Sequence, residues 1–166
     1  MQPIDTYEVL ATVPLFAEVL DERQLAGLAA RCHLAAFPAG SILMAEGDFG
    51  TSMFVIAEGV VEVTVAGKRG EPHEVAELGP GEIVGEMSLM TGARRNATAT
   101  ALGDVVAVEI TKVALEAILA RAPDLIDSFG AVLVRRQAER DRVARDAAHG
   151  GIHDLVSQIR RFFGGA

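Results

Sequence analysis

The sequence predicts an α+β fold, an antiparallel β jelly roll flanked by N-terminal helices and C-terminal lid helices. Eleven of the 17 glycines lie between residues 40 and 103, where they separate short apolar segments. Turn signals at roughly 8–12-residue intervals are typical of sandwiches and barrels. Apolar residues at both ends of the chain recur instead at helical spacing. We expect one domain over 1–147, with the roll over about 33–110 and the lid helices over about 112–147, and an amphipathic tail over 148–166.

The expected strands are short apolar runs bounded by turn residues. Valines at positions 61, 63 and 65 alternate with polar residues, which is the period of a half-buried strand. Small residues alternate in the same way after Asn96. Glycines on both sides of a Lys-Arg pair indicate a hairpin tip at 67–70. In chain order, we expect strands over 33–37, 42–45, 53–57, 60–66, 73–78, 97–102 and 105–110.

The expected helices are defined by their start and stop signals. Asp21 is a suitable N-cap for the first of them, and Thr111 is a suitable N-cap for the helix that follows the roll. Pro123 allows a new helix to begin, which is strongly apolar at first and charged later. Two glycines at 150–151 interrupt the helical pattern before the tail. The expected helices cover 21–30, 111–121, 125–147 and 152–163.

The composition predicts an ordered protein that is cytoplasmic or lies on the cytoplasmic side of a membrane protein. Half of the residues are hydrophobic and 23% are charged, which excludes a disordered polymer. No run of 18 uncharged apolar residues occurs, so we expect no transmembrane helix. Asp5 and Glu8 lie where a signal peptide would be basic and then apolar. Cys32 is the single cysteine, which excludes an internal disulfide.

The net charge of −8 is unevenly distributed along the chain. Residues 131–166 hold seven arginines against four acidic residues, so the rest of the chain carries the acidic excess. Binding to the phosphates of nucleic acids requires a positive surface, and we therefore expect no nucleic acid partner. Residues 1–130 could bind an anionic small molecule only at a local site that supplies positive charge or hydrogen-bond donors.

One segment, residues 83–98, combines groups suited to a sugar phosphate. Gly85 permits a close backbone approach, and Glu86 begins a short helical turn. The first N–H groups of such a turn have no intrahelical partner and can bind an anion. Arg94 and Arg95 follow at the start of the next strand, and a planar guanidinium can bind phosphate through two hydrogen bonds. Glu86 can accept hydrogen bonds from neighbouring hydroxyl groups.

This segment resembles the phosphate-binding cassette of cyclic nucleotide-binding domains, which occur in the catabolite activator protein, protein kinase A regulatory subunits and cyclic nucleotide-gated channels. The matching motifs are Gly-Glu-Met-Ser-Leu at 85–89 and Arg-Asn-Ala-Thr at 95–98. Val-Pro-Leu-Phe at 13–16 and Phe-Pro-Ala-Gly at 37–40 match as well, and the pattern is most similar to that of bacterial channel domains. The resemblance covers roughly residues 8–140. It implies cAMP or cGMP as the ligand, without a further cofactor.

The resemblance implies a role for each polar residue of the cassette. Glu86 would bind the ribose 2′-hydroxyl, and Arg95 would pair with the cyclic phosphate. The backbone N–H groups of Gly85, Ser88 and Ala97 would face the sugar phosphate.

The remaining site residues implied by the resemblance would lie around the purine base of the nucleotide or in the helical turn that begins at Glu86. Asn96 stands where a Ser or Thr is commoner in the family, and a Thr there often favours cGMP, so the nucleotide preference stays open. Val65 and Val84 match positions that line the purine and the ribose. Arg136 matches a residue that caps the purine from the lid, and Met87 lies in the phosphate turn.

The function implied by the resemblance is a regulatory binding module and not an enzyme. Ligand binding would move the lid helices and act on an effector, in a stand-alone receptor or in the C-terminal sensor of a larger protein such as a channel. A cupin-like metalloenzyme is one alternative, although His73 beside Glu74 or Glu77 supplies only one histidine ligand. A degenerate scaffold that binds no nucleotide is another, supported only by Asn96. The tail over 148–166 is expected to pack, to oligomerise or to contact a membrane surface.

Overall fold

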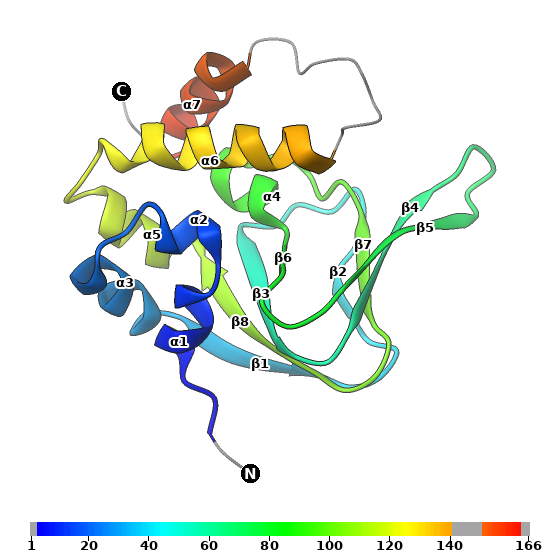
Figure 1. Cartoon of the computed structure of the whole chain (residues 1–166). Coiled ribbons are helices and arrows are strands. Elements are labelled where there is room, and N and C mark those ends of the chain that lie inside the picture. Colours follow the sequence, from blue (N-terminus) through cyan, green and yellow to red (C-terminus); the bar gives the residue numbers. More distant parts are fainter. Residues whose placement is uncertain (1–2, 141–150, 164–166) are drawn as a thin grey trace.

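The strands form two antiparallel four-stranded sheets that together make a roll (Figure 1). The computed structural model describes residues 3–140 and 151–163. One sheet contains, in spatial order, β1 (His33–Phe37), β8 (Val105–Thr111), β3 (Ser52–Glu58) and β6 (Ile83–Val84). The other contains β2 (Ile42–Met44), β7 (Thr98–Ala101), β4 (Val61–Ala66) and β5 (Pro72–Leu78). The predicted jelly roll is confirmed.

The apolar core of the roll follows from the alternation of side chains along the strands. Val61 and Val63 of β4 are buried and lie opposite Ala101 and Ala99 of β7. Small residues at these positions leave room for the larger side chains of the facing sheet, such as Ile56. The seven predicted strands are present, whereas β6 was not predicted, because two residues are too few to show a periodic pattern.

Helices cover two sides of the roll (Figure 1). None of the helices within the described parts of the chain is long and apolar enough to cross a bilayer. The described helices are α1 (Thr6–Ala11), α2 (Pro14–Ala17), α3 (Glu22–Ala29), α4 (Glu86–Thr91), α5 (Lys112–Leu119), α6 (Leu125–Arg140) and α7 (Gly151–Phe162). In Figure 1, α1, α2, α3 and α5 lie to the left of the roll, and α6 and α7 lie above it. The charged part of the helix predicted beyond residue 140 lies outside the described residues.

Both predicted N-caps are confirmed. The Asp21 side chain accepts a hydrogen bond of 2.7 Å from the Gln24 backbone N–H, and the Gln24 side chain accepts one of 3.0 Å from the Asp21 N–H. This reciprocal pair is a capping box. The Thr111 hydroxyl oxygen accepts a hydrogen bond of 3.2 Å from the N–H of Ala114 at the start of α5.

The helices pack around a second apolar cluster that the roll shares with α6. The rings of Phe16 on α2 and Phe129 on α6 meet edge to face, with centroids 6.2 Å apart. Arg135 of α6 donates a hydrogen bond of 2.6 Å to the Glu18 carboxylate. These contacts hold α6 across the N-terminal helices and over α4 (Figure 1).

Cys32 lies between α3 and β1 and is partly buried. Burial raises the pKa of its thiol to about 12, so the thiol stays protonated. A protonated thiol is neither a nucleophile nor a metal ligand. The neighbouring His33 is exposed at the start of β1.

Candidate functional site

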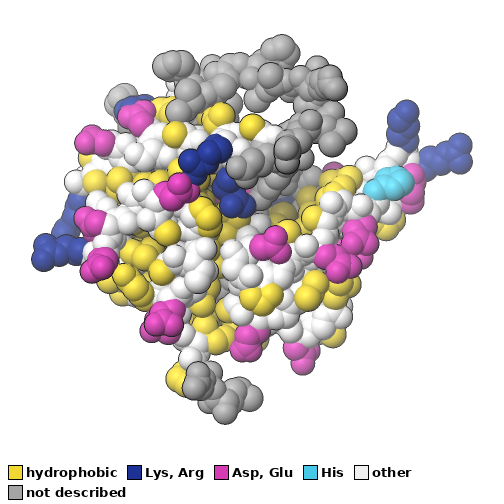
Figure 2. All heavy atoms as spheres, viewed as in Figure 1, with side chains coloured by type: hydrophobic (Ala, Val, Ile, Leu, Met, Phe, Trp, Pro, Cys, Tyr) yellow, Lys and Arg dark blue, Asp and Glu magenta, His cyan; other side chains and the backbone are white. Residues whose placement is uncertain are grey.

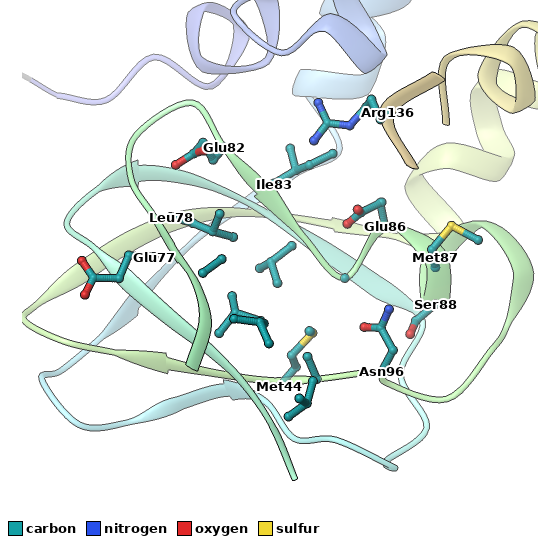
Figure 3. A pocket seen from close by; sticks show the side chains of 17 residues that line it. Met44, Glu77, Leu78, Glu82, Ile83, Glu86, Met87, Ser88, Asn96 and Arg136 are labelled. Carbon is teal, nitrogen blue, oxygen red and sulfur yellow. The ribbon is translucent and has the colours of Figure 1, made fainter. Parts of the chain in front are cut away.

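A cavity of about 590 Å³ opens between the second sheet, the α4 turn and α6 (Figure 3). One end is formed by the residues that begin α4, and the other by apolar side chains of β4 and β5. The lining residues are Met44, Val63, Val65, Val75, Ala76, Glu77, Leu78, Glu82, Ile83, Val84, Gly85, Glu86, Met87, Ser88, Asn96, Ala97 and Arg136. All the site residues predicted from the sequence are among them except Arg95.

The polar end of the cavity is built on Gly85, which caps the N-terminus of α4. Its backbone is left-handed, with φ at 87°, a conformation that costs glycine nothing. A Cβ at this position would also lie 2.8 Å from Nη1 of Arg95 and 3.2 Å from the Ser52 carbonyl oxygen. Glycine is therefore required both for the direction of the turn and for the close packing behind it.

Glu86, Ser88 and Asn96 bring oxygen and amide groups to the same end of the cavity (Figure 3). Glu86 is only 5% exposed and Ser88 only 3%, whereas Asn96 is exposed at the mouth. Buried carboxylates are rare because the loss of hydration is costly, and they occur where hydrogen-bonding groups compensate for it. The Glu86 carboxylate in the cavity wall is thus suited to accept hydrogen bonds from a hydroxylated ligand.

Arg95 lies directly behind the cavity wall. Its guanidinium is buried, donates from Nη1 to the Ser52 carbonyl at 2.6 Å and the Gly85 carbonyl at 3.3 Å, and donates from Nη2 to the Ser52 hydroxyl at 3.3 Å. Burial lowers the pKa of Arg95, and the carboxylate of Glu109 opposes this effect. Arg95 therefore lies beside the turn that begins α4. Its hydrogen bonds go to Gly85 and Ser52, and its side chain does not line the cavity.

Arg94 has a different environment from its neighbour. It is exposed, its guanidinium carbon lies 4.2 Å from the centre of the Phe49 ring, and Nη1 donates to the Gly47 carbonyl at 3.3 Å. These contacts anchor the loop between β2 and β3 and do not reach the cavity lining. Of the two arginines, Arg95 is the one beside the site.

The apolar end of the cavity extends beyond Val65 and Val84, the two valines predicted from the sequence. Val63 of β4 and Ala76 and Leu78 of β5 add to the wall. Val75 is more than half exposed and lies where the β4–β5 register shifts, which turns it towards the cavity mouth. The alternation along β4 indicated Val63, but no sequence signal marked the register shift.

The lid side of the cavity is formed by α6. Arg136 projects from α6 over the cavity (Figure 3). The next residue, Gln137, donates from Nε2 to the sulfur of Met87 at 3.5 Å, which joins α6 to α4. The predicted purine-capping residue is thus placed at the mouth of the cavity.

The charged residues that line the cavity are mostly acidic, with Glu77, Glu82 and Glu86 against Arg136. Figure 2 shows acidic side chains scattered over the viewed face, with basic ones among them and at the tip of the projecting β4–β5 hairpin. Lys68 and Arg69 occupy that tip. Among residues 3–140 and 151–163, no group of three or more His, Cys, Asp or Glu side chains is placed to hold a metal ion.

The sequence profile of the cyclic nucleotide-binding domain matches residues 34–122, more than half of the chain. The chain belongs to the cyclic nucleotide-binding domain family. This confirms the resemblance drawn from the cassette motifs. The match covers the roll, the α4 turn and α5, and it ends before α6.

The curated relatives of this cyclic nucleotide-binding domain include a receptor and a channel. The cyclic AMP receptor protein of Thermus thermophilus is 32% identical over 105 residues, which cover 63% of this chain and 49% of that protein. A cyclic nucleotide-gated potassium channel of Rhizobium etli is 29% identical over 134 residues, which cover 81% of this chain and 36% of the channel. The chain thus spans half or less of the length of these two relatives.

Solved structures of the family share the fold of this cyclic nucleotide-binding domain. The N-terminal domain of a Streptomyces coelicolor transcriptional regulator is 31% identical with a TM-score of 0.70, and the alignment covers 86% of this chain and 99% of that one. The Thermus thermophilus catabolite activator protein is 30% identical with a TM-score of 0.68, over 78% of this chain and 61% of that one. Because such relatives include transcriptional regulators, the absence of a nucleic acid partner stays a prediction.

Proposed function

We propose that this chain is a regulatory module that binds one cyclic nucleotide in the cavity between the α4 turn, the second sheet and α6. The observation that carries the proposal is the division of one cavity into two ends of different chemistry. Buried Glu86 and the first N–H groups of α4 form one end, and a wall of the β4 valines with Ala76 and Leu78 forms the other, where Glu77 and Glu82 also lie (Figure 3). A cyclic nucleotide carries an anionic phosphate and ribose hydroxyl at one end and a flat purine at the other.

Each chemical group of the cyclic nucleotide has a residue in the cavity that can bind it. The 2′-hydroxyl donates to Glu86, and the phosphate accepts hydrogen bonds from the N–H groups at the start of α4. The purine packs against the apolar wall, and the guanidinium of Arg136 stacks over it. Asn96 offers both a donor and an acceptor at the polar end of the cavity, and we propose that its side chain reaches the edge of the base and discriminates adenine from guanine.

Arg95 supplies the cation for the phosphate by exchanging hydrogen-bond partners. Its two bonds of 3.3 Å, to Gly85 and to the Ser52 hydroxyl, are the longer ones. A phosphate oxygen is a stronger acceptor than either group, because it carries negative charge and can pair with the guanidinium through two parallel hydrogen bonds. The bond of 2.6 Å to the Ser52 carbonyl keeps the guanidinium anchored during the exchange.

Calorimetric titration of the full chain with cAMP and with cGMP tests the proposal. We expect one site per chain and saturable binding of at least one of the two nucleotides. Asn96→Ala is expected to change the affinity for one nucleotide more than the affinity for the other, so the ratio of the cAMP and cGMP affinities should shift. Failure of both nucleotides to bind would contradict the proposal and favour the degenerate scaffold.

We further propose that the ligand acts on an effector by fixing α6 over the cavity. A ligand shifts a conformational equilibrium only if it binds one state more tightly. The groups of the roll contact the ligand wherever α6 lies, whereas Arg136 contacts it only when α6 covers the cavity. The difference in binding free energy between the state with α6 over the cavity and the state with α6 away from it therefore comes from α6.

Amide exchange with and without cyclic nucleotide tests this coupling. Protection is expected to rise both in 84–98 and in 124–137. Arg136→Ala is expected to weaken binding about tenfold and to remove the second effect. Ser128→Ala is the matched control, because Ser128 is exposed on α6 and does not line the cavity. If exchange in 124–137 is the same with and without ligand, α6 does not act as a lid.

A further inference from the structure

The C-terminal end of α4 is in contact with a residue of α7. Gly92, which ends α4, has a left-handed backbone with φ at 75°. A Cβ built on Gly92 would lie 2.5 Å from the Phe162 ring, so the ring packs directly on the glycine backbone. Phe162 is the last residue of α7. A side chain from α7 therefore closes the end of α4 that is opposite to the cavity.

Contacts with α4, α5 and α6 hold α7 in this position. Leu155 and Ile159 are buried in the apolar cluster that contains the inner residues of α4 and α6. Arg160 donates to both carboxylate oxygens of Asp127 on α6 at 3.1 Å. Nζ of Lys112, at the start of α5, lies 4.4 Å from the centre of the Phe162 ring. The apolar side of the predicted tail is thus covered by the domain itself.

The helix α4 is too short to hold its own position. Its six residues make fewer than two turns and span about 9 Å. Isolated helices of this length are unstable in water, so the placement of α4 depends on what it packs against. Its N-terminal turn lines the cavity, Met87 contacts Gln137 of α6, and Gly92 contacts Phe162. One short helix therefore joins the Phe162 contact to the residues that line the cavity.

We infer that Phe162 is a positioning residue for the ligand site, which acts by holding α4 and with it the turn at Gly85 and Glu86. The part that concerns ligand affinity rests on the proposed function. The cavity is fully formed while α7 is docked, and no described residue of α7 lines it. Docked α7 therefore favours ligand binding, and by thermodynamic reciprocity a bound ligand favours docked α7.

The test compares four variants of the full chain. Phe162→Ala removes the ring, and Phe162→Leu restores an apolar side chain of intermediate size. Gln158→Ala changes an exposed residue of α7, and Leu25→Ala removes a buried side chain from α3, away from α4. The readouts are amide exchange in 86–92 without ligand, affinity for the tighter of cAMP and cGMP, and thermal stability.

Phe162→Ala is expected to speed exchange in 86–92 and to weaken nucleotide binding about tenfold. Phe162→Leu should recover most of both losses, and Gln158→Ala should change neither. Leu25→Ala should lower thermal stability without a selective effect on 86–92 or on affinity. Nucleotide should also slow exchange in α7 of the unmodified chain.

The inference is overturned if exchange in 86–92 is no faster in Phe162→Ala than in Leu25→Ala. It is also overturned if the unmodified chain binds nucleotide and Phe162→Ala binds it equally well. If the unmodified chain binds neither nucleotide, the proposed function fails, and exchange in 86–92 still decides whether Phe162 positions α4. A double-mutant cycle with Gly92→Ala gives a second measurement, because the added methyl group should be less destabilising when the Phe162 ring is absent.

Discussion

Replacement of Arg95 by alanine is expected to weaken cyclic nucleotide binding about 100-fold or more. The phosphate would lose its cation in an acidic body, and a buried charge-assisted pair is worth several kcal/mol when one partner is deleted. The substitution also removes the donor to the Ser52 and Gly85 carbonyls, which loosens the phosphate turn. Calorimetric titration measures the loss.

Two comparisons separate the charge of Arg95 from its structural contacts. Arg94→Ala is the matched control, since that exposed residue stacks on Phe49 and should change affinity less than about twofold. A nucleoside without phosphate, such as adenosine, should lose little affinity on Arg95→Ala. If adenosine and cAMP lose the same factor, Arg95 only braces the turn and does not pair with the phosphate.

Alanine at Glu86 is expected to weaken binding by about 1–3 kcal/mol, which is about 5- to 150-fold. The reason is that a carboxylate only 5% exposed in the cavity wall would no longer accept the ribose 2′-hydroxyl. A 2′-deoxy cyclic nucleotide should bind the unmodified chain poorly and should lose little more on Glu86→Ala. Titration of both proteins with both ligands completes the cycle.

The outcome of that cycle distinguishes direct contact from an indirect effect. Strong coupling between the side chain and the hydroxyl is the expected result. If the two losses simply add, Glu86 does not touch the 2′-hydroxyl and stabilises the turn in another way. Glu82→Ala is a suitable control, because Glu82 also lines the cavity but binds the Gly79 N–H at 2.6 Å.

The strands and helix caps were predictable because each depends on neighbouring residues. Alternating valines marked β4, and Asp21 and Thr111 marked the starts of α3 and α5 by their side-chain chemistry. In contrast, α1, α2 and β6 are too short for a periodic pattern to mark them. Local sequence therefore indicated the roll well and its shortest elements poorly.

The part of the site that the sequence could not predict depends on contacts between distant segments. The motif placed Arg95 beside the turn, but the direction of its guanidinium is set by the Ser52 carbonyl at the start of β3. The amphipathic pattern of the tail indicated that its apolar side would be covered. It could not show that Phe162 would meet Gly92.

The contact between Phe162 and Gly92 has a consequence for the order of events during biosynthesis. A chain is synthesised from its N-terminal end, so strands β1 to β8 and α4 leave the ribosome before α7 does. Until α7 has emerged, the end of α4 lacks the ring that packs on Gly92. The polar end of the cavity can therefore take its final form only after nearly all of this sequence has been synthesised, although its own residues emerge much earlier.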